Sequence, residues 1–295
     1  MKPAAFEYVR PATVADAVAA LAAYDGEAKV IAGGQSLVPV MNFRLLAPAA
    51  LVDINGIAGL DFIAETAEGG LRIGALVRHH RLMTAAAVRA RFPVLAEAMR
   101  HVAHLAIRNR GTIGGSLSHA DPAAELPMMT VLLDATLRVA GPNGMREVAA
   151  ADFFTGALAT VLAKDELLTE VVLPPLARAG WAFHEFAQRA GDYALAAVGV
   201  TLTTTIDGRA ADVRLAVTGV GEKPLRLAAA EAALNGHPLD AERIATAVAT
   251  VRAAVTPSDD LHGSAGYRRH LVGGLVGRAL QDAGRRARNP SQKSS

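Results

Sequence analysis

The chain of 295 residues contains no cysteine, and this absence excludes several kinds of chemistry. Iron–sulfur clusters are held by cysteine thiolates, and structural zinc sites are usually built from them. Disulfide bonds are excluded as well, which agrees with a reducing compartment. If the protein takes part in redox chemistry, an organic cofactor has to carry it.

Long apolar runs are also missing. No stretch of roughly 18 or more uninterrupted apolar residues occurs, so the sequence predicts no membrane span. The segment from Met1 to Tyr8 lacks the apolar core of a signal peptide. We therefore expect a cytoplasmic protein.

The chain carries little excess charge of either sign. Its formal net charge is +2, with 52% hydrophobic and 20% charged residues, which is typical of a globular protein. The tail from residue 285 onward is basic, but no aromatic residues lie between its charges. This is a weak signal for nucleic acid, so we expect no nucleic-acid partner and a disordered tail at 289–295.

The sequence does contain two glycine-rich segments, which lie far apart in the chain. A strand expected at 29–32 leads into Gly33-Gly34-Gln35-Ser36, and Thr112-Ile113-Gly114-Gly115-Ser116 follows Gly111. Glycine allows positive φ and close approach of a ligand, and free N–H groups and hydroxyls suit a phosphate. One extended diphosphate would explain both segments, although a plain turn would explain either alone. Neither segment has the G-x-G-x-x-G or G-x-x-x-x-G-K-[ST] pattern, so Rossmann and P-loop sites are not indicated.

The order of the remaining elements predicts an α+β protein. Residues 1–56 have a βαβ-like pattern, and Pro174-Pro175 marks the best internal boundary. Before that boundary we expect hairpins at 60–75 and around 142–144, a strand at 170–173, and helices at 82–91, 93–106 and 123–134. After it we expect strands at 181–188, 195–206 and 213–220 in an antiparallel meander, and then helices at 225–234, 240–254 and 265–286.

The two glycine segments resemble the paired FAD loops of the medium subunit of molybdenum hydroxylases. This family includes the carbon monoxide dehydrogenase medium chain and the FAD domain of xanthine dehydrogenase. Further matching segments are Lys2 to Pro11, Asn42-Phe43-Arg44, Ala120-Asp121-Pro122 and Gly191-Asp192-Tyr193. The resemblance implies a two-lobed FAD-binding (PCMH-type) region, with lobe 1 at 1–56 and lobe 2 at 57–175. It also implies a C-terminal flavoprotein domain at 178–288, made of a three-stranded antiparallel sheet and a helix bundle.

The resemblance further implies which residues contact FAD. The two loops would hold the diphosphate, and Glu125 would contact the adenosine ribose, with Asp121 as the second candidate. Tyr193 would lie near the isoalloxazine ring, and Leu168 would touch the ring. A charge in the first turn of a helix is a structural alternative for Glu125, and a core position is one for Tyr193. The full set of expected FAD contacts is Ala32, Gly33, Gly34, Gln35, Ser36, Leu37, Gly111, Thr112, Ile113, Gly114, Gly115, Ser116, Glu125, Leu168 and Tyr193.

The function implied by the resemblance is electron transfer, so we expect no catalytic acid or base and no metal ligand on this chain. A large subunit would hold the molybdenum cofactor, and a small subunit would hold the [2Fe–2S] clusters. Together they would form a dimer of heterotrimers in which FAD passes electrons to an external acceptor. The absence of cysteine agrees with clusters on another chain. Two alternatives remain: a stand-alone FAD oxidoreductase of the same fold, and a non-enzymatic nucleotide-binding module.

Overall fold

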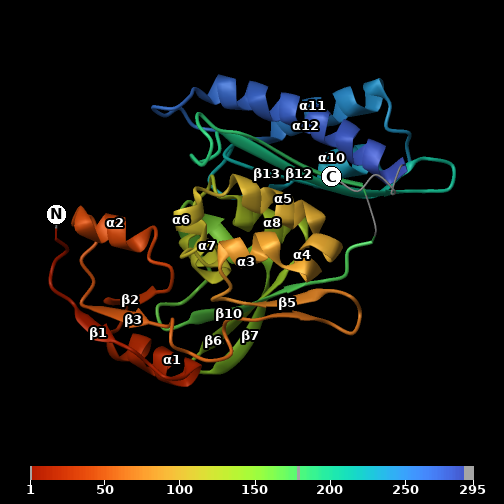
Figure 1. Cartoon of the computed structure of the whole chain (residues 1–295). Coiled ribbons are helices and arrows are strands. Elements are labelled where there is room, and N and C mark those ends of the chain that lie inside the picture. Colours follow the sequence, from red (N-terminus) through yellow and green to blue (C-terminus); the bar gives the residue numbers. More distant parts are fainter. Residues whose placement is uncertain (1, 178–179, 289–295) are drawn as a thin grey trace.

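The computed structural model describes residues 2–177 and 180–288, which form three packed regions (Figure 1). The expected start of the C-terminal domain at Arg178 and the tail 289–295 lie outside the described residues. Mixed helices and antiparallel sheets confirm the predicted α+β class. Within the described ranges, no helix is both long and apolar enough to traverse a bilayer.

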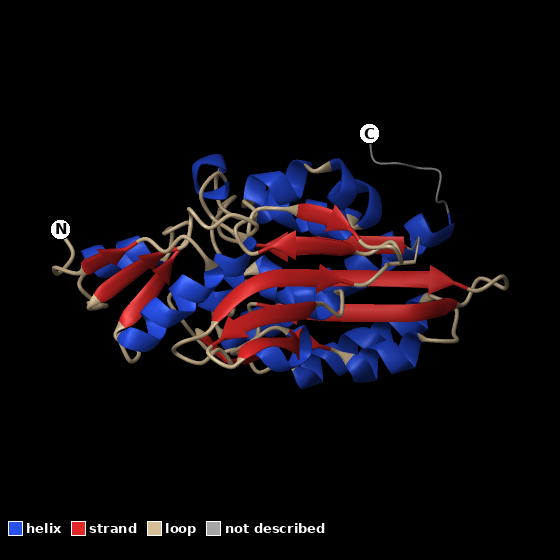
Figure 2. Cartoon of the chain, turned by 90° about the horizontal axis from the view of Figure 1, so that it is seen from below, coloured by secondary structure: helices blue, strands red, loops and turns tan. Residues whose placement is uncertain are grey.

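Lobe 1 is a small parallel sheet with the strand order β1-β3-β2, and it stands apart from the larger sheets (Figure 2). Its first helix begins at a capped position, because the Thr13 side chain accepts a hydrogen bond from the N–H of Asp16 at 3.1 Å. Ala17, Val18 and Leu21 on that helix are buried against the sheet. The elements are β1 (Glu7–Val9), α1 (Val14–Ala23), β2 (Ala28–Ile31), α2 (Leu37–Asn42) and β3 (Ala50–Asp53).

Lobe 2 is an antiparallel sheet with the order β4-β5-β10-β6-β7, covered on one face by short helices. Both predicted hairpins are present, as β4–β5 and β6–β7. The strands are β4 (Ile63–Glu65), β5 (Leu71–Gly74), β6 (Thr136–Gly141), β7 (Gly144–Ala149), β8 (Phe154–Gly156), β9 (Ala159–Thr160) and β10 (Leu167–Leu173). The helices are α3 (His79–Thr84), α4 (Ala86–Arg91), α5 (Pro93–His101), α6 (Leu105–Arg108), α7 (Ile113–His119), α8 (Glu125–Leu132) and α9 (Ala150–Phe153).

Several predicted helices of lobe 2 have different limits in the structure. The helix expected at 82–91 is two helices, α3 and α4, which meet at the extended residue Ala85. The helix expected at 93–106 breaks after α5, because Ala103 adopts a φ of 43°. The Arg108 guanidinium donates to the carbonyls of Val102 (2.8 Å) and Ala103 (2.7 Å), so both carbonyls at this break have hydrogen-bond partners. The second glycine segment is not a loop, since it forms the first turns of α7.

The C-terminal region confirms the predicted meander, with β11, β12 and β13 paired in antiparallel order. A short strand β14 extends it, so the helix expected from residue 225 begins only at Ala228. Strand β12 is buried on both faces, because α12 covers one side and α8 of lobe 2 packs on the other, while α5 packs on the neighbouring strand β11 (Figure 1). The elements are β11 (Gly180–Phe186), β12 (Ala196–Thr204), β13 (Ala210–Thr218), β14 (Leu225–Arg226), α10 (Ala228–Leu234), α11 (Ala241–Ala254) and α12 (Ala265–Arg288).

Candidate functional site

The two glycine segments, one from each lobe, are in direct contact. A Cβ atom at Gly33 would lie 2.5 Å from the carbonyl oxygen of Arg110 and 2.9 Å from the Cα of Gly111. Both distances are shorter than a van der Waals contact, so no larger residue fits at position 33 without moving one loop. The fold therefore brings together two segments that are almost eighty residues apart in the chain.

A series of hydrogen bonds between polar side chains connects the two segments. The Asn55 side-chain amide donates to the carbonyl of Ala32 at 2.8 Å. The Arg78 guanidinium donates to the Asn55 amide oxygen at 2.7 Å and, with its other nitrogen, to the carbonyl of Arg110. We infer that Arg78 and Asn55 hold the loops in register. Sequence reasoning missed both, because Asn55 looks like part of a turn and Arg78 like part of a polar surface stretch.

The first loop presents unused backbone donors. Gly34 has a φ of 70°, which turns the chain after β2. The N–H groups of Gly34, Gln35 and Ser36 donate to no backbone carbonyl in the parts of the chain that the structure describes. The Gln35 side chain folds back and donates to the carbonyl of Gly33 at 2.7 Å, so it braces the loop. This loop therefore offers a ligand its backbone N–H groups, which suit a phosphate.

The second segment differs from the expectation that its N–H groups are free. The N–H of Gly114 donates to Ala75 at 2.9 Å, and that of Gly115 donates to the Thr112 hydroxyl at 3.0 Å. The N–H of Ser116 donates to the Thr112 carbonyl at 3.0 Å, as an ordinary helical bond. Thr112 is thus the N-cap of α7. The exposed backbone of Gly115 and the partly exposed Ser116 are what remains available to a ligand.

A buried histidine holds this cap in place. The His79 side chain is buried, and its Nε2 lies 2.9 Å from the carbonyl of Thr112. Burial, together with the nearby charges of Arg78 and Arg108, lowers the pKa of His79 to about 4, although the hydrogen bond to Thr112 acts in the opposite direction. The ring is therefore neutral at physiological pH. Because its partner is a carbonyl, the ring carries its proton on Nε2.

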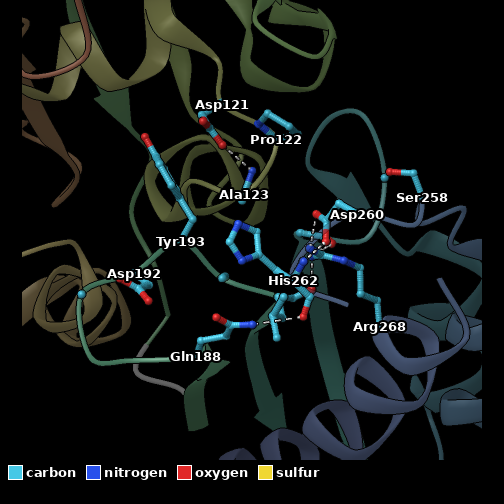
Figure 3. Close-up of a pocket in the computed structure, with 15 residues that line it drawn as sticks. Asp121, Pro122, Ala123, Gln188, Asp192, Tyr193, Ser258, Asp260, His262 and Arg268 are labelled. Atoms are coloured by element: carbon cyan, nitrogen blue, oxygen red, sulfur yellow. Dashed lines mark hydrogen bonds and ion pairs between the residues drawn. The ribbon is translucent and has the colours of Figure 1, made fainter. Parts of the chain in front are cut away.

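A cavity of about 490 Å³ lies between lobe 2 and the C-terminal region (Figure 3). Its walls come from Asp121 to Ala123 and from the C-terminal segments 188–195 and 258–268. Tyr193 stands in this wall with its hydroxyl toward Asp121. Asp121 follows closely after α7, whose first turns are the second glycine segment, so the cavity lies near the end of that helix.

The environment of Tyr193 keeps its hydroxyl protonated. Partial burial, together with the carboxylates of Asp121 and Glu125, raises the pKa of Tyr193 to about 12. The phenol can therefore donate a hydrogen bond at any physiological pH. Because 58% of the Tyr193 surface is still exposed, Tyr193 is not the core residue that the structural alternative predicts.

Glu125 and Leu168 are both buried. Glu125 is the first residue of α8, and burial, together with the charge of Asp121, raises its pKa to about 7. Leu168 is 2% exposed and packs in the core of lobe 2, so it presents almost no surface to a ligand. The structure thus gathers the two loops, Tyr193 and Asp121 around one site and leaves Leu168 in the core beneath it. Their contacts with FAD stay predictions.

Comparisons with known proteins identify the family. Residues 4–176 match the family model described as the FAD binding domain in molybdopterin dehydrogenase. Residues 181–283 match the CO dehydrogenase flavoprotein C-terminal domain. The nicotine 6-hydroxylase medium subunit of Paenarthrobacter nicotinovorans is 42% identical over 97% of this chain and 100% of the relative. The carbon monoxide dehydrogenase medium chain of Hydrogenophaga pseudoflava is 36% identical over 96% and 98%.

Solved structures agree with these matches. The chain is similar to one in carbon monoxide dehydrogenase from Hydrogenophaga pseudoflava, with a TM-score of 0.95, 38% identity and coverage of 97% and 99%. It is also similar to a chain of quinoline 2-oxidoreductase from Pseudomonas putida 86, with a TM-score of 0.93, 39% identity and the same coverage. The predicted resemblance, oxidoreductase class and FAD cofactor are therefore confirmed, and the chain belongs to the family of FAD-binding medium subunits that includes the carbon monoxide dehydrogenase medium chains.

Proposed function

We propose that this chain is the electron-transfer subunit of a multisubunit molybdenum-containing hydroxylase or dehydrogenase. Its FAD would receive electrons from a [2Fe–2S] subunit and pass them to an external acceptor. The observation that carries the proposal is the contact of Gly33 with Arg110 and Gly111, which puts free N–H groups of one loop beside the second loop. An FAD diphosphate needs such paired contacts, and bound FAD supplies the exchange between one- and two-electron steps.

The residues around the site fit FAD in distinct ways. The N–H groups of Gly34, Gln35 and Ser36 would hold one phosphate, because they lack backbone partners among the described residues. Gly115 and the Ser116 hydroxyl would face the other phosphate. The Tyr193 hydroxyl would donate to the flavin end, where the cavity beside Asp121 leaves room for a ring.

The buried acid Glu125 would face the ribose, since a carboxyl group can accept from sugar hydroxyls. In the described part of the chain, no group of three or more acidic or histidine side chains is placed to hold a metal ion. We therefore assign the chain's own side chains to binding and orienting FAD. The chemistry on the substrate would take place elsewhere.

Partner subunits follow from what this chain cannot supply. It has no cysteine, so iron–sulfur clusters have to reside on another chain. Two relatives are named a medium subunit and a medium chain. We propose a large molybdenum-cofactor subunit and a small [2Fe–2S] subunit as partners, assembled as a dimer of heterotrimers. Residues 1–56 and 57–175 would be the two FAD-binding lobes, and 178–288 the flavoprotein C-terminal domain.

The test is purification of the chain from its native host together with whatever binds it. We expect flavin absorbance bands, a released chromophore with the mass of FAD, and two unlike subunits that copurify. A chain that turns over substrate alone, without partners, would favour the stand-alone FAD oxidoreductase. A folded, colourless chain that cannot be reconstituted with FAD would favour the nucleotide-binding module.

A further inference from the structure

A buried carboxyl group on β11 lines a second cavity and has no hydrogen-bond partner. The Glu185 side chain is only 3% exposed, and its Oε2 accepts no hydrogen bond from the described residues. Its Oε1 lies 4.0 Å from Nδ1 of His101, which is too far for a hydrogen bond. Buried polar groups in proteins normally have partners, so this exception requires an explanation.

The cavity beside Glu185 is large enough to admit a group from another molecule. It has a volume of about 460 Å³ and lies between α5 and the segment that follows β11. Glu97, Arg100 and His101 of α5 form one wall, and residues 187 and 189–191 form the other. Its volume lies within the range of about 300–1,000 Å³ that is usual for ligand pockets. A side chain from outside can therefore reach the Glu185 carboxyl group.

The positive groups around this cavity do not neutralise Glu185. The Arg100 guanidinium lies 3.4 Å from the Glu97 carboxylate, and its side chain is 70% exposed. Arg189 is also exposed. Burial lowers the pKa of His101, so the ring that lies nearest to Glu185 is mostly neutral at neutral pH. Burial raises the pKa of the Glu185 carboxyl group to about 8, as expected for an acid that lacks a cation.

We propose that this cavity receives an arginine side chain of a partner subunit, whose guanidinium group binds both oxygens of the Glu185 carboxylate. The inference rests on the proposed function, because it takes the chain to work in a multisubunit complex. A planar guanidinium group donates two parallel hydrogen bonds to one carboxylate, whereas a lysine ammonium group is a point charge. The guanidinium group is also more weakly hydrated, so its burial costs less. The chemistry of the site therefore favours arginine.

The position of the cavity suits a partner that delivers electrons. Gly191 lines both this cavity and the one beside Tyr193, which we assign to the flavin end of FAD. A Cβ atom at Gly191 would lie 2.7 Å from Cε1 of His104, so the segment between the two cavities packs tightly against the chain that follows α5. The rate of electron transfer falls steeply with distance. A subunit anchored at Glu185 would dock beside the flavin, which a free small cation would not require.

The test is the affinity of the full chain for the subunits that copurify with the wild type, measured by surface plasmon resonance. Glu185→Gln keeps the shape of the side chain but presents one acceptor oxygen and no charge. Its Kd for these subunits should rise about thirtyfold or more, because loss of one side of a buried charge pair leaves the other side unpaired. Its FAD content should equal that of the wild type, because the cavity beside Glu185 is not the proposed FAD site.

Two further variants serve as controls. Glu97→Gln removes a carboxylate that lines the same cavity but pairs with the exposed Arg100, so its Kd should rise by less than about fivefold. Glu185→Asp keeps the charge on a shorter side chain, and its Kd should lie between those of the wild type and Glu185→Gln.

The stability of the chain without its partners separates docking from a structural role. Alone, Glu185→Gln should unfold at the same urea concentration as the wild type or at a higher one, because an unpaired buried acid is removed. A lower midpoint would show that Glu185 has a partner within this chain, which would overturn the inference. An unchanged Kd of Glu185→Gln for the copurifying subunits would also overturn it and leave the proposed function standing. If no subunit copurifies with the wild type, the proposed function and this inference fail together.

Discussion

Replacement of Gly33 by alanine should separate the two glycine loops. The added Cβ would lie 2.5 Å from the Arg110 carbonyl oxygen, whereas an ordinary C···O contact is about 3.3 Å or more, so a loop has to move by about 0.8 Å. Overpacking of this kind costs about 1–3 kcal/mol of unfolding free energy. The variant Gly33→Ala, which adds a single methyl group, is therefore the first test of the site.

The same displacement should weaken FAD binding by a predictable factor. A phosphate hydrogen bond of about 2.9 Å would stretch to about 3.7 Å and be lost. One charge-assisted bond is worth about 1.5–3 kcal/mol, which corresponds to a roughly ten- to hundredfold higher Kd. Equilibrium dialysis of FAD against the wild type and Gly33→Ala measures this factor directly.

The matched control for this prediction is Gly274→Ala in α12. A Cβ at Gly274 meets no atom within 4 Å, so alanine should stabilise the helix by about 0.5–1 kcal/mol and leave FAD affinity unchanged. If Gly33→Ala binds FAD as the wild type does and unfolds at the same denaturant concentration, the close contact between the loops does not shape the site.

Two further predictions concern charged side chains. Arg78→Lys should raise the Kd of FAD by about tenfold, because one ammonium group cannot replace a guanidinium that reaches both Asn55 and Arg110. The control is Arg81→Lys, which changes an exposed ion pair. Equal FAD affinities of the two variants would contradict the reasoning. Glu170→Gln should lower the unfolding free energy at pH 7 by about 1 kcal/mol. Burial raises the pKa of Glu170, but Arg72 and Arg138 outweigh it and hold the pKa below its ordinary value. The stabilisation is thus present above the unfolded-state pKa and is lost as the pH falls through the folded-state pKa. Urea unfolding should therefore give the wild type and Glu170→Gln the same unfolding free energy in acid. A difference that persists in acid would refute the assignment.

The sequence was enough to predict most of the strands and helices and the two glycine segments, because these depend on local patterns, but it missed α7 and the short strands β8, β9 and β14. It could not predict that Ala103 takes a positive φ and ends a helix, since alanine normally favours continuation. Periodicity also did not show that Thr112 caps a helix and accepts hydrogen bonds from the N–H groups of Gly115 and Ser116.

The residues that join distant parts of the chain were the least predictable. Arg78 and Asn55 are ordinary polar residues until the fold brings Arg110 and Ala32 beside them. Glu185 lies in a strand whose neighbours alone do not indicate that its carboxyl group is left without a partner. Such positions depend on long-range contacts, which no local pattern records.

Strand β12 has a consequence for how this chain can be divided. One of its faces completes the core of the C-terminal helices, and the other completes the core around α5 and α8. A cut at Pro174-Pro175 would therefore expose apolar surface on both products. Recombination or engineering that exchanges the C-terminal half has to preserve the packing surface of α5 and α8, because the boundary in the sequence is not a boundary in the core.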